Sequence, residues 1–242
     1  MERFKFYRRW AASGLVNFTV REKETDILVS ADMDLKSKAE DLVRRYRGDI
    51  EDYIKVNPEF RKTLKPMPPD EKAAEIIKAM LSASRAAGVG PMAAVAGAIS
   101  EFAGKGLLKY SNQVILENGG DIFIKTDRER KIGIYAGDSI LSGRVAIKLK
   151  PDKGPKGIST SSGTVGHSLS LGNADAVTVI SPDGSLADAS ATAVCNMVKT
   201  APDINRALDF AKSIEGVTGC VVIYKDRIGS IGDIELTQGG AK

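Results

Sequence analysis

Residues 158–196 read ISTSSGTVGHSLSLGNADAVTVISPDGSLADASATAVCN. The segment contains His167, which is the only histidine of the chain, a run of hydroxyl side chains, and a strand-like Ala176–Ile180 that ends in a turn. Beyond the turn, Asp188 and Thr192 are four residues apart. On a helix they would lie on one face, near the amino-terminal end where backbone N–H groups are unpaired. Oxygen ligands beside free amide donors suit a divalent cation that holds a phosphate.

The same residues also permit simpler interpretations. Ser185 and Asp188 have the spacing of a capping box, in which the carboxylate would bond the first amides of its own helix and need no metal. Thr192 could bond the carbonyl of Asp188 instead of a cation. His167 is the only imidazole available as a general base, but a single histidine could equally be a hydrogen-bonded structural residue.

The composition indicates an ordinary globular protein that can bury a real core. The chain has 242 residues, with 35 basic and 31 acidic side chains and a formal charge of +4. Because this mild positive charge is spread along the chain, nucleic acid is not expected as the main partner. No apolar run reaches the roughly 20 residues of a membrane span, and the amino terminus lacks a signal core. We therefore expect a cytoplasmic protein without a membrane partner.

The two cysteines, Cys195 and Cys220, form no Cys-x-x-Cys pair, so neither a disulfide framework nor a zinc site is indicated. With one histidine in the chain, a centre of several imidazoles is excluded. We expect both thiols to be buried and inert, one in a helix and one in a strand.

Hydrophobic periodicity predicts the elements of the amino-terminal part. Alternating residues indicate strands, with Lys23-Glu24 as a tight connection, and helical spacing indicates two amphipathic helices, the first with Asp34 as a candidate cap and Gly48 as an interruption. The expected strands are Phe4–Trp10, Leu15–Glu22 and Ile27–Ser30, and the expected helices are Leu35–Ile54 and Asp70–Ala87. Pro66–Pro69 stops helical structure between them and is a candidate boundary.

Short strands dominate the rest of the chain. Asn118-Gly119 between two apolar runs is typical of a type I′ hairpin turn, and Asp203 is a candidate cap for a last helix at Asn205–Ile214. The expected strands are Val114–Glu117, Ile122–Lys125, Lys131–Tyr135, Val145–Leu149, Ala176–Ile180, Cys220–Tyr224 and Arg227–Ile231. The pattern predicts one α+β domain over residues 1–242, with mainly antiparallel sheets backed by helix pairs, a hint of a duplicated unit, and an internal boundary near 64–70.

Residues 92–106 are almost all small, so another group must approach this backbone closely. One candidate is another helix or the sheet. The other is a ligand whose phosphates lie over the loop at Gly88–Gly90 and the following helix start.

Four short segments resemble, in order along the chain, motifs of the ApbE-type flavin transferases. Gly97-Ala98-Ile99 resembles that family's Gly-Ala-Ile segment, and Asn118–Asp121 resembles its Gly-Gly-Asp motif. Ser159–Gly163 is similar to Thr-Ser-Gly, and Ala187–Ala193 is similar to Ala-Asp-Ala-x-Ala-Thr. The match covers residues 90–200, and the last motif is the most specific. Segments such as Gly90–Ile99 are closer to the small ApbE-related proteins of anaerobic archaea and bacteria.

The resemblance implies an ApbE-like tunnelling-type fold and a magnesium-dependent transfer of FMN from FAD to a protein threonine. It implies Asp188, Thr192 and the carbonyl of Ala98 as metal ligands and His167 as the catalytic histidine. The nucleotide site would comprise Gly90, Asn118, Gly119, Gly120, Asp121, Thr160, Ser161, Ser162 and Gly163.

Three functions follow as expectations. The chain is a magnesium-dependent flavin or nucleotidyl transferase with a protein acceptor, a binding protein that has kept the FAD or nucleotide pocket without turnover, or a component of anaerobic sulfur assimilation towards homocysteine. The last predicts a reactive cysteine or a sulfur-handling partner. Pairing of sheets between subunits makes a homo-oligomer a further expectation.

Overall fold

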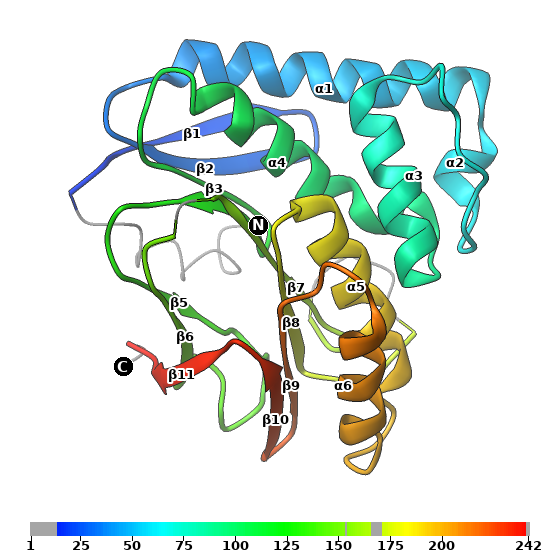
Figure 1. The fold of residues 1–242 in the computed structure, drawn as a ribbon, viewed down its shortest axis with the longest axis vertical. Helices are drawn as coiled ribbons and strands as arrows, with labels where there is room; N and C mark the ends of the chain where they lie inside the picture. Colours follow the sequence, from blue (N-terminus) through cyan, green and yellow to red (C-terminus); the bar gives the residue numbers. More distant parts are fainter. Residues whose placement is uncertain (1–13, 153, 166–170, 241–242) are drawn as a thin grey trace.

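One antiparallel sheet of eight strands runs through the molecule (Figure 1). The computed structural model describes residues 14–152, 154–165 and 171–240. Within them the strand order is β1-β2-β3-β4-β7-β8-β9-β10, with every neighbouring pair antiparallel. The strands are β1 (Val16–Glu22), β2 (Thr25–Ala31), β3 (Val114–Asn118), β4 (Asp121–Lys125), β7 (Lys156–Ser161), β8 (Ala176–Ser181), β9 (Gly219–Tyr224) and β10 (Arg227–Gly232).

Helices cover one face of this sheet, and a second, three-stranded sheet covers part of the other (Figure 1). The small sheet has the order β11-β6-β5, from β5 (Arg130–Gly133), β6 (Val145–Leu149) and β11 (Glu235–Gln238). The helices are α1 (Lys36–Val56), α2 (Glu59–Lys62), α3 (Glu75–Ala87), the 3₁₀ turn η2 (Pro91–Ala94), α4 (Val95–Leu107), α5 (Gly184–Met197) and α6 (Asp203–Ser213). The predicted α+β class with mainly antiparallel sheets is confirmed.

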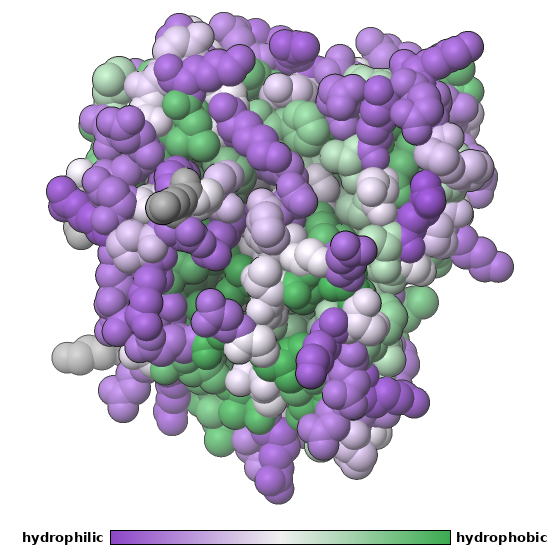
Figure 2. Space-filling view, in the orientation of Figure 1, coloured by the Kyte–Doolittle hydropathy of each residue, from purple (hydrophilic) through white to green (hydrophobic). Residues whose placement is uncertain are grey.

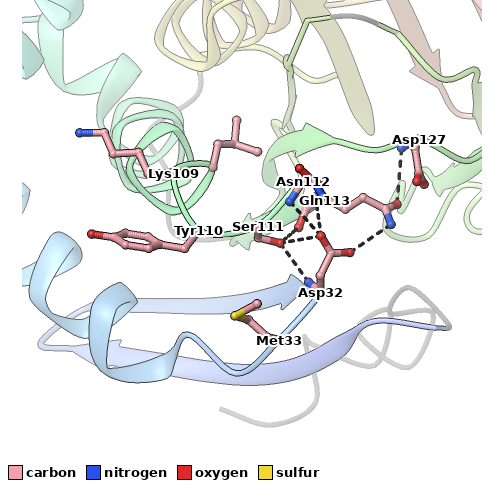
Figure 3. Close-up of a pocket in the computed structure, with 9 residues that line it drawn as sticks. Asp32, Met33, Lys109, Tyr110, Ser111, Asn112, Gln113 and Asp127 are labelled. Carbon is pink, nitrogen blue, oxygen red and sulfur yellow. Dashed lines mark hydrogen bonds between the residues drawn. The ribbon is translucent and has the colours of Figure 1, made fainter.

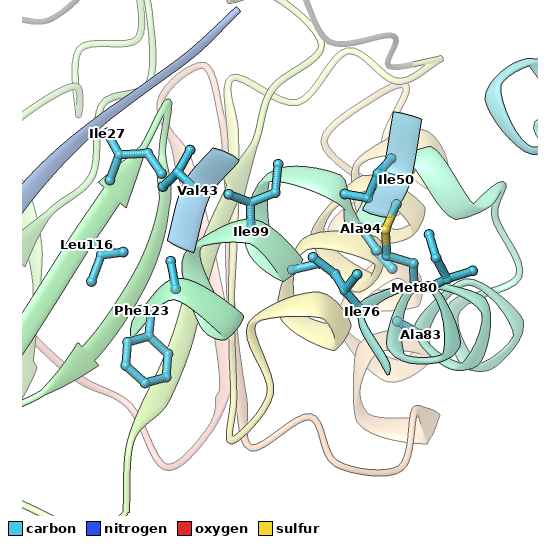
Figure 4. Packing of buried hydrophobic residues seen from close by; sticks show 14 of the residues in the cluster. Ile27, Val43, Ile50, Ile76, Met80, Ala83, Ala94, Ile99, Leu116 and Phe123 are labelled. Atoms are coloured by element: carbon cyan, nitrogen blue, oxygen red, sulfur yellow. The ribbon is translucent and has the colours of Figure 1, made fainter. Parts of the chain in front are cut away.

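Among the described residues, three hydrophobic clusters hold these layers together. The largest lies between β1–β4 and helices α1, α3 and α4, where Phe123 and Leu116 of the sheet face Ile99 of α4 and Val43 of α1 (Figure 4). A second joins α5 and α6 to β8 and β9, and a third fills the space between the two sheets. Alternation along each strand sends successive side chains to opposite clusters, which fixes the register.

Several predicted boundaries shift in the structure. Helix α1 continues through Gly48, and α3 begins at Glu75 rather than Asp70. Gly88 ends α3 with a left-handed φ of 74°, a conformation that glycine adopts without strain. The short helix α2 and the strands β7 and β11 were not predicted. The expected strand at Phe4–Trp10 lies outside the described residues.

Two predicted caps are wrong. Asp34 precedes the cap position of α1, which Leu35 occupies, although its Oδ1 accepts a hydrogen bond from the Lys36 amide at 2.9 Å. Asp203 is the first residue of α6, and its carboxylate accepts from the backbone amides of Lys199 and Thr200 in the preceding turn.

The hairpin between β3 and β4 has the predicted type of turn, shifted by one residue. Asn118 pairs with Asp121, so Gly119 and Gly120 are the two central residues, and both have positive φ (67° and 114°), as a type I′ turn requires. The backbone conformation of the turn therefore explains the two glycines, and the turn places Asp121 at the first position of β4.

No single helix among the described residues is long and apolar enough to cross a membrane. By length and composition alone, α3 together with the segment Pro91–Leu107 could do so, but the pair is bent by 107°. Both helices bury residues in the largest cluster. The surface in Figure 2 is mainly polar, with hydrophobic residues showing between charged ones mostly in its lower half.

Candidate functional site

The starts of α4 and α5 meet, and each is bonded by a carboxylate from the other helix. Asp188 of α5 accepts a hydrogen bond through Oδ2 from the backbone amide of Gly97, in the first turn of α4, at 2.9 Å. Glu101 of α4 accepts through Oε2 from the backbone amide of Ser185 at 3.0 Å and from its hydroxyl at 2.8 Å. Such first-turn amides have no partner within their own helix. We call this arrangement the reciprocal cap.

The reciprocal cap replaces the capping box that residues 185–188 would form by themselves. Asp188 reaches across to α4, so its carboxylate does not cap its own helix. The Ser185 amide in the first turn of α5 is also not free for a phosphate, because Glu101 already holds it. The expectation of a free amide donor at this helix start is therefore wrong for Ser185, and the capping-box alternative is wrong as well.

Close backbone contact makes the junction possible. A Cβ atom on Gly97 would lie 2.2 Å from the Gly184 carbonyl oxygen, and one on Gly157 of β7 would lie 2.4 Å from the Gly184 Cα. Only glycines allow α4, α5 and β7 to approach this closely. The small residues of α4 therefore face another helix here, as the simpler interpretation expected. Gly90 likewise packs against the chain itself, since its Cβ would lie 2.0 Å from the Thr63 carbonyl oxygen.

A second carboxylate, from the sheet, lies against Asp188. Asp121 is buried (8% exposed), and Asp188 is half-buried. Burial and then the neighbouring charge of Asp188 raise the pKa of Asp121 well above its usual range. Burial also raises the pKa of Asp188, against the opposing effect of the Gly97 and Ala96 amides and of Asp121. Two adjacent carboxyl groups, one buried and one half-buried, favour sharing a proton or binding a cation.

Ser159 completes this group and was not among the predicted site residues. It pairs with Asp121 across β4 and β7, so both side chains lie on the helix-covered face. Ser159 is 1% exposed, and its hydroxyl lies close enough to Asp121 to lower the pKa of that carboxyl group. The Ser159 hydroxyl does not, however, form a hydrogen bond of normal geometry with any described residue. A buried hydroxyl without such a partner is uncommon and leaves an oxygen for a ligand.

The structure brings other predicted residues close to this group. Asn118 Nδ2 donates to the Ala96 carbonyl oxygen at 3.3 Å, which ties the hairpin to the first turn of α4. The backbone amide of Thr160 donates a hydrogen bond to the Gly120 carbonyl oxygen. Ala98 is buried in α4 next to Gly97, and Thr192 is half-buried one turn after Asp188.

The hydroxyl run of residues 159–162 divides between two faces of the sheet. The Thr160 side chain bonds the Thr178 hydroxyl at 2.9 Å, on the face away from Asp121. Ser161 lies on the same face as Ser159. Ser162 Oγ accepts from the amides of Thr164 and Val165 in a local turn. A Cβ on Gly163 would meet the Gly172 carbonyl oxygen at 2.1 Å, so this glycine too is required by its own chain.

His167 lies outside the described residues, so its predicted role stays a prediction. Among the described residues no group of three or more His, Cys, Asp or Glu side chains could hold a metal ion. The pair Asp121 and Asp188, with Ser159 beside it, nevertheless suits Mg²⁺. This ion is usually bound by one or two carboxylates together with substrate phosphates and water.

A separate hollow of about 430 Å³ surrounds Asp32 between β2 and the segment after α4 (Figure 3). Ser111 Oγ, the Gln113 side chain and the backbone amides of Asn112 and Gln113 all donate to the Asp32 carboxylate. Although burial acts to raise it, these bonds hold the pKa of Asp32 below its usual value. Since the carboxylate is occupied by the chain itself, we interpret this network as structural.

Both cysteines are buried, as predicted, and no disulfide joins them. Burial raises the pKa of Cys220 to about 12, so its thiolate does not form near neutral pH. The structure therefore offers no support for the reactive cysteine that the sulfur-assimilation alternative predicts.

Comparisons with known proteins agree with this fold. A family model described as "AbpE bacteria" matches residues 8–219. A UPF0280 protein of Methanocaldococcus jannaschii is 42% identical over 218 residues, covering 88% of each chain. A UPF0280 protein of Methanococcus aeolicus is 43% identical over 217 residues, covering 87% of this chain and 88% of its own.

Solved structures share the architecture at much lower identity. The apo flavinyl transferase ApbE of Pseudomonas stutzeri has a TM-score of 0.57 at 16% identity, with 90% of this chain and 93% of that chain covered. The ApbE protein of Thermotoga maritima has a TM-score of 0.53 at 13% identity, with 89% and 96% covered. At these identities the likeness shows the ApbE-like fold. The family-model match and the curated relatives together show that this chain belongs to the ApbE-related family that includes the UPF0280 proteins.

Proposed function

We propose that this protein binds Mg²⁺ at Asp121 and Asp188 together with a flavin or adenine dinucleotide such as FAD, and that it transfers the FMN part to an acceptor hydroxyl. One observation carries the proposal. Strand β4 and helix α5 bring two carboxylates to one half-buried place beside the first turn of α4. In a transferase of this kind the cation would neutralise charge on the pyrophosphate.

Different residues of the chain would bind the cation, bind the nucleotide and accept the proton. Asp188 would hold the cation while the Gly97 amide fixes its orientation, and Asp121 would be the second ligand. We include Thr192 and the Ala98 carbonyl as further ligands from the family resemblance, with Asn118–Gly120 and Ser161–Gly163 lining the nucleotide site. His167 is proposed as the base that takes the acceptor proton. The acceptor oxygen forms a bond to the FMN phosphorus, and AMP leaves.

Calorimetric titration and AMP release test the proposal. Purified protein would be titrated with FAD, with and without Mg²⁺, and AMP would then be measured by chromatography with a threonine-containing acceptor peptide. We expect Mg²⁺-dependent FAD binding that Asp188→Asn weakens at least tenfold. Asp52→Asn is the matched control, because Asp52 is exposed on α1 and pairs with Lys55.

The outcomes separate the candidate functions. FAD binding with AMP release that requires His167 supports the transferase. FAD binding without AMP release in the presence of a range of acceptors favours a binding protein. Equal FAD affinity of wild type and Asp188→Asn, or no affinity for FAD, ADP or ATP in either, would contradict the proposed site.

A further inference from the structure

Glu101 is an unusual buried charge that the proposed transfer reaction does not use. It is 3% exposed and lies in the middle of α4. Its Oε2 accepts hydrogen bonds from Ser185, and its Oε1 lies 2.5 Å from the Nζ of Lys105. Lys105 also lies 3.8 Å from Asp183, at the residue before α5. Burying a carboxylate is costly unless it is paired, and here both of its partners belong to the junction of α4 and α5.

Glu101 and Asp188 bond the starts of α4 and α5 at the same junction. Ser185 and Asp188 are separated by one helical turn, as are Gly97 and Glu101, so the two helices are joined by two crossed bonds one turn apart. Between these bonds the backbones touch at Gly97 and Gly184. A small rotation of α5 about this contact would separate the Asp188 carboxylate from the Gly97 amide and from Asp121.

We infer that Glu101 is a positioning residue for the carboxylate pair. By holding the start of α5 it sets Asp188 against the Gly97 amide and Asp121, so that a cation meets both carboxylates already in place. For its effect on a cation the inference rests on the proposed function, whereas its effect on the helix junction does not. Residues that orient metal ligands change metal affinity by about 10- to 100-fold when they are removed.

Mn²⁺, read by electron paramagnetic resonance, is a probe of the carboxylate pair that needs no nucleotide. We expect Glu101→Ala to bind Mn²⁺ at least tenfold more weakly than wild type. Glu101→Gln keeps an acceptor oxygen for the Ser185 amide and hydroxyl, so it should stay within about threefold of wild type if position, rather than charge, is what matters. Glu75→Ala is the matched control, since Glu75 is an exposed helical glutamate paired with Lys78.

Backbone amide hydrogen exchange provides a readout without any metal. In Glu101→Ala the amides of Ser185 and Gly97 should both exchange at least tenfold faster, and in Glu101→Gln the Gly97 amide should remain protected. Should Glu101→Ala be too unstable to study, Ser185→Ala, which removes only the hydroxyl contact, should show the same changes in milder form.

Two results would overturn the inference. One is unchanged Gly97 protection in a folded Glu101→Ala protein. The other is equal loss of Mn²⁺ affinity in Glu101→Ala and Glu101→Gln, which would mean that the charge acts and the position does not. If wild type binds no Mn²⁺ but the exchange results hold, the proposed function fails while the positioning role of Glu101 stands.

Discussion

Replacing Gly97 by alanine should disrupt the junction of α4 and α5 at one atom. The added Cβ would lie 2.2 Å from the Gly184 carbonyl oxygen and 2.7 Å from the Asp188 Cβ. Real Cβ atoms do not approach other atoms this closely, so α4 and α5 must separate. Because the nearest group is backbone, no rotation of a side chain relieves the contact. The substitution therefore tests both the packing and the Asp188 hydrogen bond.

The expected magnitude follows from two opposing effects. Overpacking of a well-packed interior costs about 1–3 kcal/mol. Alanine recovers about 0.5–1 kcal/mol through its better helix propensity. Because a contact of 2.2 Å with backbone places the overpacking cost near the upper limit of its range, we expect Gly97→Ala to lower the free energy of unfolding by about 2 kcal/mol. Gly48→Ala is the control: Gly48 also lies within a helix, a Cβ there meets nothing within 4 Å, and we expect a gain of about 0.5–1 kcal/mol.

Urea unfolding followed by circular dichroism measures both variants on the same scale. The same samples, titrated with Mn²⁺, show whether separation of the helices also weakens the proposed cation site. A Gly97→Ala protein as stable as Gly48→Ala would refute the packing argument. A destabilised Gly97→Ala protein with wild-type Mn²⁺ affinity would show that the junction does not position the carboxylates.

Three further predictions concern other parts of the molecule. The pKa of Asp32 is lowered in the folded state, so its contribution to stability is full above the unfolded pKa of about 3.9 and is lost as the pH falls through the lower folded value. The stability difference between wild type and Asp32→Asn, about 1 kcal/mol for this exposed network, should therefore be constant from pH 5 to 8 and shrink below about pH 4 in urea titrations. Ser190→Ala should leave stability unchanged or raise it by up to about 1 kcal/mol in thermal unfolding, because the Ser190 hydroxyl is buried without a hydrogen-bond partner; a clear loss would reveal a partner. Neither cysteine should react with a thiol reagent in the native protein, while both should react in guanidinium chloride; rapid native labelling would contradict their burial.

Local sequence patterns were sufficient to predict a helix or strand where the segment has one exposed face. The helical repeat of α1 and the alternation of β1 and β2 predicted those elements to within a few residues, because burial on one side imposes the period on the sequence. Strand β7 was missed because its hydroxyl side chains on both faces hide the alternation, and it is held between β4 and β8 by the sheet. Its position decides which of those hydroxyls can reach Asp121.

The candidate site shows more clearly what cannot be predicted from neighbouring residues alone. Asp188 was selected together with Thr192 from their helical spacing, and Asp121 was selected through the family resemblance. The structure places Asp121 and Asp188 together. Glu101 was not selected, because nothing near it in the sequence marks it. Ser159 lies within the segment that resembles Thr-Ser-Gly, but it was not among the predicted site residues. The capping box at Ser185 and Asp188 was a sound local expectation. It is overridden by a carboxylate 84 residues away that takes the Ser185 amide.

The reciprocal cap also makes the two halves of the chain dependent on each other. Helix α4 belongs to the half that supplies β1–β4, and α5 belongs to the half that supplies β7–β10. Each half therefore carries a helix whose beginning is completed only by a side chain of the other, at a point where no water-filled gap separates them. A chain severed between β4 and β7 should yield two fragments that order themselves together, when mixed, rather than one at a time.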